Sequence, residues 1–152
     1  MRSTAAPAFS LTSRFVLNVG YLDDLNVYRF HAKELIGGVA YRWSRDTSYV
    51  ALPSIDRART LTLWLSDGGR PQTASPARVT VFLNDRLLGS ADVTHGFNPY
   101  AFPIVADVWP AGLTTDDAAT IKLVSTTWNP RRALGVGDDR DLGVMVHRVE
   151  VK

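Results

Sequence analysis

The sequence predicts an all-β protein, an antiparallel β-sandwich of the jelly-roll kind with about eight strands and very little helix. Three observations favour this fold class. Short runs alternate apolar and polar residues, which is the pattern of half-buried strands. Turn residues punctuate these runs, and no apolar repeat at helical spacing persists for three turns. The chain also ends in an apolar run, residues 144–151, that follows an acidic turn, as expected for a strand that closes a sandwich.

The alternating runs define the expected strands in chain order. They cover residues 15–19, 39–43, 50–53, 61–65, 78–83, 87–93, 120–125 and 144–151. Asn84 and Asp85 tolerate positive φ and predict a tight hairpin between two of the runs. The apolar parity of the last run changes near His147, which predicts a β-bulge there. We expect one helical turn at residues 116–119, and we expect the first and last strands to lie in the same region.

Length and composition indicate one folded unit. The chain has 152 residues, of which 45% are hydrophobic and 21% charged, and this suffices for a single core. Residues 1–13 are expected to be a flexible lead-in, and residues 14–152 a single β-sandwich domain. No stretch approaches the roughly 18 apolar residues of a membrane span, and the first residues lack the apolar segment of a signal peptide. The chain is therefore expected either to begin in the cytoplasm or to be a piece of a longer protein.

The charge, the cysteine content and the motifs of the sequence disfavour several function classes. The net charge of +2 comes from interleaved charges, which argues against a nucleic-acid partner. Cysteine is absent, so a cysteine nucleophile is excluded and the redox compartment is left open. A Gly-x-Ser-x-Gly elbow is also absent. The three histidines lack metal-type spacing. We expect no cofactor.

Acidic side chains leave two further functions open. Asp138, Asp139 and Asp141 could contribute to a Ca²⁺ site, but calcium needs six or more oxygens, and the preferred interpretation is a surface turn whose aspartates pair with Arg140. Glu34 and Asp24 could form the carboxylate pair of a glycan hydrolase, although such pairs occur in any chain with 15 acidic residues.

Aromatic side chains are the best candidates for ligand contacts. Sugars present flat C–H faces that stack on aromatic rings, while charged and amide side chains bond their hydroxyls; the same rings also fill β-sandwich cores. The candidate ligand-binding residues lie in or beside turn-rich segments: Tyr21, Tyr28, Tyr100 and Trp109 as the platform, with Asp24, His31 and Glu34 as the nearest polar partners.

A second group of residues is expected to be structural. Trp43 and Trp128 lie next to bends, where they would close the ends of the core. Arg42 and Arg140 lie beside strand ends, and the planar guanidinium suits bidentate bonds to a carboxylate such as Asp138. We expect at least one of these arginines to hold the loop at residues 128–141 against the sandwich.

Three segments of the chain resemble a known kind of domain. The first comprises residues 18–30, Glu34, residues 41–44 and residues 51–53; the second is the hairpin at residues 81–89, where Asp85 replaces a glycine; the third comprises residues 125–130 and 138–143. Together they resemble the galactose-binding-like jelly-roll domains attached to bacterial membrane glycosyltransferases of the polyprenyl-phosphate mannosyltransferase kind. The resemblance covers about residues 15–151. It implies that the chain is a piece of a longer protein, an extracytoplasmic, non-catalytic accessory domain with a carbohydrate-binding-module-like fold, while catalysis belongs to a separate membrane portion.

The sequence thus favours a non-catalytic domain that recognises a glycan or positions a glycan substrate at a bacterial cell envelope. Its expected partners are a glycan or glycolipid and an attached or associated membrane protein. A structural or protein-interaction β-sandwich without a sugar ligand is the main alternative, and a glycan hydrolase is the third. A cytoplasmic location is kept as an alternative, and the oligomeric state is left open.

Overall fold

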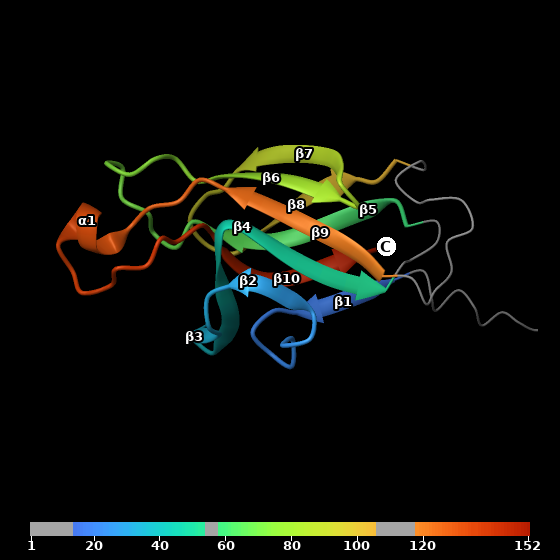
Figure 1. Ribbon diagram of the computed structural model, residues 1–152, viewed down its shortest axis with the longest axis horizontal. Coiled ribbons are helices and arrows are strands. Elements are labelled where there is room, and N and C mark those ends of the chain that lie inside the picture. The colour runs from blue at the N-terminus through green and yellow to red at the C-terminus, as the bar shows by residue number, and fades with distance from the viewer. Residues whose placement is uncertain (1–13, 54–57, 106–117) are drawn as a thin grey trace, which may run out of the picture.

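The computed structural model describes residues 14–53, 58–105 and 118–152 (Figure 1). These residues contain ten strands and one short helix. In chain order the elements are β1 (Phe15–Asn18), β2 (Val27–Phe30), β3 (Glu34–Ile36), β4 (Val39–Pro53), β5 (Thr60–Ser66), β6 (Arg78–Leu83), β7 (Arg86–Asp92), β8 (Asn98–Pro103), β9 (Ala118–Ser125), α1 (Pro130–Leu134) and β10 (Met145–Val151). The predicted antiparallel β-sandwich with very little helix is confirmed.

The long strand β4 joins the two layers of the sandwich. Its first half pairs with β3 and β10, and its second half pairs with β2 and β9. One layer, which we call the front sheet, has the order β7-β6-β9-β4-β2, and the other, the back sheet, has the order β8-β5-β10-β1. In Figure 1 the front sheet faces the viewer. Because β4 crosses between the layers, hydrogen bonding continues around one edge of the sandwich.

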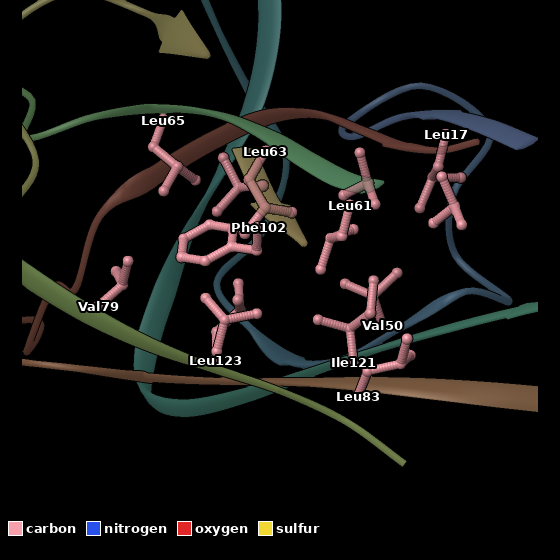
Figure 2. Close-up of a cluster of buried hydrophobic side chains, with 14 of the residues drawn as sticks. Leu17, Val50, Leu61, Leu63, Leu65, Val79, Leu83, Phe102, Ile121 and Leu123 are labelled. Carbon is pink, nitrogen blue, oxygen red and sulfur yellow. The ribbon is translucent and has the colours of Figure 1, made fainter. Parts of the chain in front are cut away.

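Alternation along each strand explains the core. In β9, Ile121 and Leu123 are fully buried, whereas Lys122 and Val124 point outward and are at least partly exposed. The inward side chains of the two sheets meet in one cluster, in which the β5 leucines face those of the front sheet (Figure 2). A second, smaller cluster contains Tyr41, Trp43, Leu142 and Met145. Apolar burial on this scale is the main stabilising contribution to a domain of this size.

Three local predictions are also confirmed. Asn84 and Asp85 have φ of 48° and 65°, so the turn between β6 and β7 uses the left-handed conformations that were expected. The pairing of β10 with β5 shifts register between Val146 and Arg148, which places a bulge at His147. Strand β1 pairs with β10, Phe15 opposite Val151, so the first and last strands lie side by side.

Other local predictions need correction or lie outside the described residues. The runs at residues 39–43 and 50–53 are one strand, because the polar residues between them continue the ladder as β4 changes layer. Ala118 and Ala119 begin β9, so the helical turn predicted at residues 116–119 is wrong for them, because their backbone groups pair with β4. The described residues do not include residues 1–13, Trp109, or Asp116 and Asp117 of the predicted helical turn.

The sequence prediction missed β2, β3, β8 and the helix α1. Helix α1 has recognisable signals: Asn129 is its N-cap and accepts a hydrogen bond from the Arg132 backbone, Pro130 starts it, and Gly135 ends it with φ of 71°. These are common cap residues, but a five-residue helix shows no apolar periodicity. None of the described helices is long and apolar enough to cross a membrane.

Candidate functional site

The loop at residues 128–143 closes one end of the sandwich and is fixed by Arg140. Trp128 and Leu142 pair through both backbone hydrogen bonds at the base of the loop. The Arg140 guanidinium donates to Asp138 at 3.0 and 2.8 Å and to Glu34 of β3 at 2.9 Å. The hydrogen bonds from Arg140 lower the pKa of the Asp138 carboxyl to about 2. Arg140 therefore ties the loop to the hairpin formed by β3 and β4.

A buried ion pair fixes a second loop, residues 19–26. Asp23 is fully buried and accepts hydrogen bonds from Arg42 at 2.8 and 3.0 Å and from the Gly20 backbone at 2.8 Å. Burial alone would raise the pKa of Asp23, but the hydrogen bonds from Arg42 and Gly20 outweigh it, and the pKa is lowered. Arg42 also bonds the exposed Asp24 at 2.7 Å. Both arginines expected to anchor loops are thus ion-paired.

An open pocket lies between the loop at residues 128–143 and the end of the front sheet. Its volume is about 610 Å³. The lining is formed by Arg29, His31, Arg45, Asp46, Thr127, Asp139, Arg140 and Asp141. All of these side chains are polar or charged. They can donate and accept hydrogen bonds with a hydroxyl-rich ligand, which an apolar pocket cannot do.

Two features of β2 and β4 bring these side chains together. Arg29 has φ of 61°, so Tyr28 and Arg29 are both exposed between Val27 and Phe30, which pack against the core. Arg29 donates to the Thr47 carbonyl at 3.0 Å and to Asp46 at 2.9 Å. The left-handed Arg29 thereby directs one cation from the edge strand toward the residues where β4 bends.

His31 lies in the wall of the pocket and is 7% exposed. Its Nε2 lies 2.9 Å from the carbonyl oxygen of Asp141, and since a carbonyl only accepts, Nε2 carries the proton. Burial lowers the pKa of His31, and the positive charges of Arg45 and Arg140 lower it further. At neutral pH this histidine is therefore an uncharged hydrogen-bonding group.

A pair of tyrosines lies beside the pocket on the outer face of the front sheet. Tyr28 of β2 is directly opposite Tyr49 of β4, and their ring centroids are 5.9 Å apart with the planes tilted by 39°. The row continues across the sheet, because Tyr49 is opposite Lys122 of β9 and Lys122 is opposite Phe82 of β6. Tyr28 is 68% exposed. The face thus presents aromatic surface to solvent next to a polar pocket.

The structure brings only some of the expected site residues together. His31 lines the pocket and Tyr28 lies beside it. Glu34 bonds Arg140 and Tyr41. Tyr21 is exposed on the loop at residues 19–26. Tyr100 belongs to the back sheet, where it packs against the core and bonds Thr94.

The remaining expected residues belong to the supporting structure. Trp43 is buried in the smaller cluster, and Trp128 packs against it. Arg42, Asp138 and Arg140 form the two loop anchors described above, and Asp24 pairs with Arg42 and Lys33.

Sequence reasoning missed Arg29, Arg45, Asp46, Thr127, Tyr49 and Lys122. Tyr49 had a usable signal: Val50 and Leu52 alternate as inward residues of one strand, and this parity directs Tyr49 outward. Tyr49 was passed over because tyrosines outside alternating runs were preferred, although the outward positions of a sheet face also lie within such runs. The left-handed Arg29 has no comparable signal in the sequence.

The acidic side chains of the pocket are all ion-paired. Arg29 bonds Asp46 at 2.9 Å, Arg131 lies 3.4 Å from Asp139, and Arg132 lies 3.0 Å from Asp141. Each of these carboxylates is therefore already in contact with a cation of the protein. Among the described residues no group of three or more metal-binding side chains is arranged to hold an ion.

Comparisons with known proteins give a likeness of fold. No protein-family model matches the chain, and no curated protein matches it in sequence. One similar solved structure is a family 35 carbohydrate binding module from an environmental isolate, with 15% identity, a TM-score of 0.48, and coverage of 91% of this chain and 92% of that chain. Another is the CBM36-1 domain of a multidomain xylanase from the hindgut metagenome of Trinervitermes trinervoides, with 12% identity, a TM-score of 0.46, and coverage of 91% and 96%. At these identities and TM-scores, the likenesses assign neither a family nor a ligand.

Replacing Arg140 with alanine should cost about 1–3 kcal/mol of unfolding free energy, the range for leaving hydrogen-bonding groups unpaired. NMR should show the pKa of Asp138 rising from about 2 toward 3.8 in this variant. Because the folded-state pKa is depressed, the pair stabilises the fold above about pH 4 and loses this effect as the pH falls toward 2. The matched control is Arg131→Ala, whose exposed pair with Asp139 should contribute at most about 1 kcal/mol. Equal unfolding curves for the two variants would contradict the anchoring role.

Proposed function

We propose that the protein is a non-catalytic glycan-recognition module, which binds its ligand across the pocket and the adjacent tyrosine pair. One observation carries the proposal: the exposed ring of Tyr28 and the half-buried ring of Tyr49 lie beside an open pocket lined by arginine, aspartate, histidine and threonine. The rings suit the C–H face of a sugar, and the pocket suits its hydroxyl groups. We further propose that the module works outside the cytoplasm at a bacterial cell envelope, attached to or associated with a membrane glycosyltransferase and its glycolipid substrates.

A titration tests this proposal directly. Mannose-, galactose- and glucose-based oligosaccharides are added to ¹⁵N-labelled protein, and the amide resonances of residues 28–31 and 45–49 are followed. We expect shifts confined to these segments, with Kd in the millimolar to micromolar range that corresponds to about −4 to −8 kcal/mol. No shift at tens of millimolar sugar would reject the glycan-binding role. Release of a sugar product in the same sample would instead support the hydrolase.

The tyrosine platform gives a sharper prediction. Tyr49→Ala and Tyr28→Ala should each weaken oligosaccharide binding by about tenfold, or 1.4 kcal/mol, because each removes stacking area. The matched control is Tyr21→Ala, which removes a ring from a separate loop. Tyr21 is 64% exposed and Tyr28 is 68% exposed. Calorimetry should find the control binding like the native protein. An equal loss for Tyr21→Ala would move the site to the loop at residues 19–26.

A second candidate function is protein interaction, and a separate surface favours it. Five large apolar side chains are exposed on the loop at residues 19–26 and on the neighbouring hairpin of β3 and β4: Tyr21, Leu22, Leu25, Leu35 and Ile36. The two segments are adjacent, since Gly20 lies against the backbone of Ala40 and Tyr41, and Lys33 pairs with Asp24. Apolar patches of this kind often mark interaction sites. None of these five side chains lines the pocket, so both functions are compatible.

A further inference from the structure

We propose that the glycan bound by this face carries an anionic group, and that Arg45 and Lys122 recognise it. The inference rests on the proposed glycan-binding function and specifies the class of glycan. Both side chains are cations on the binding face that no carboxylate of the described residues neutralises.

The first step is the pairing of charges around the pocket. Every acidic side chain in the lining is bonded by an arginine, and Arg140 bonds both Asp138 and Glu34. Arg45 differs: its backbone N–H donates to Ser48 Oγ at 2.9 Å, while its guanidinium makes no hydrogen bond or ion pair with residues 14–53, 58–105 or 118–152. The pocket therefore offers a ligand one whole guanidinium, whereas its carboxylates are already occupied.

The second step is the chemistry of that guanidinium. Arginine presents donors in a planar fork that matches the two oxygens of a carboxylate or phosphate and forms short, charge-assisted bonds. Arg45 is exposed but lines the pocket, and its charge acts on the buried His31. An anion bound there would meet Arg45 directly and would also relieve the positive field at His31. A neutral sugar would gain only ordinary hydrogen bonds.

The third step is Lys122, which extends the same chemistry along the sheet. Its position in β9 is opposite Tyr49 on one side and Phe82 on the other. Its Nζ lies 4.4 Å from the centroid of the Phe82 ring, and the described residues provide it with no carboxylate. By contrast, Arg78 of the neighbouring strand β6 bonds Asp92 at 2.8 Å, so a carboxylate already neutralises it. The tyrosine pair therefore lies between two unneutralised cations.

The spacing of these groups sets the size of the ligand. Arg45 and Tyr49 are four positions apart in β4, which is at most about 13 Å along a strand, and adjacent strands add about 5 Å each. A ligand that touches Arg45, the tyrosines and Lys122 contacts three neighbouring strands, which suits an oligosaccharide better than a single sugar. An acidic oligosaccharide meets this requirement.

The experiment compares matched charged and neutral ligands. Binding of tetragalacturonate is measured against its fully methyl-esterified form, and binding of mannose 6-phosphate against mannose, by calorimetry at low and physiological salt. The variants are Arg45→Gln and Lys122→Gln, with Arg78→Gln as the control that removes one cation of the same sheet that Asp92 already neutralises. All three side chains are on the surface, so circular dichroism should show an unchanged fold.

We expect the native protein to bind at least one charged ligand about tenfold more tightly than its neutral partner. Arg45→Gln should remove most of that preference and Lys122→Gln part of it for the tetrasaccharide, while Arg78→Gln keeps it. A preference for the uronate pair identifies a carboxylate, and a preference for the phosphate pair identifies a phosphate. Equal binding of charged and neutral ligands, or an equal loss in all three variants, would overturn this inference and leave the glycan-binding function standing. Binding of no sugar at all would overturn both.

Discussion

Asp23→Ala should destabilise the protein by about 3–5 kcal/mol, the cost of leaving one partner of a buried ion pair uncompensated. Asp23 is fully buried and accepts three hydrogen bonds, two of them from Arg42, whose side chain is 10% exposed. Removing the carboxylate takes away the two buried hydrogen bonds of the Arg42 guanidinium, which keeps only its bonds to the exposed Asp24 and to the His31 carbonyl, and it frees the Gly20 backbone N–H. The loop at residues 19–26 would lose its main anchor.

Urea unfolding at neutral pH measures this effect, and the neighbouring residue provides the control. Asp24→Ala removes a carboxylate that also bonds Arg42 but is 68% exposed, so it should cost about 1 kcal/mol or less. If Asp23→Ala fails to fold, Asp23→Asn keeps the shape and one acceptor oxygen, and it should still be less stable than Asp24→Ala. Equal midpoints for Asp23→Asn and Asp24→Ala would show that the buried pair is not the anchor.

Leu123→Ala should cost about 2–5 kcal/mol, because it leaves a cavity between the two sheets. Leu123 is fully buried and lies in the main hydrophobic cluster. The adjacent Val124 points to the outer face of the front sheet and is 38% exposed, so Val124→Ala should cost under about 1 kcal/mol. Thermal or urea unfolding of the two variants tests the face assignment of β9. Similar losses would mean that the outer face is covered, and that would also contradict the proposed binding face.

The fold was predictable because its main signal is local. Burial alternates with every residue in β6 and β9, and in β5 as far as Leu65, and period-2 alternation in the sequence indicates this directly. The Asn84–Asp85 turn and the bulge at His147 were found for the same reason, since each depends on one or two residues. Strands β2, β3 and β8 were missed because each is short or contains prolines, so alternation has too few positions to appear.

The candidate site was predictable only in part, because tertiary geometry assembles it. Tyr28 and His31 were identified from their position in a polar segment. Arg45 and Lys122 carry no sequence signal that separates them from other cations, since what distinguishes them is the absence of a carboxylate neighbour among the described residues. Pairing of charges over long sequence distances, such as Arg140 with Glu34, decides which cations remain for a ligand.

The pairing of β1 with β10 determines how the module would face its surroundings. Phe15 lies opposite Val151, so both described ends of the chain emerge together, and Figure 1 shows them at the end of the sandwich opposite α1 and the loop that borders the pocket. A segment that links the domain to another part of a protein, at either end of the chain, would leave from this same end of the sandwich. The pocket would then face away from the point of attachment. A neighbouring domain could cover it only by folding back along the full length of the sandwich.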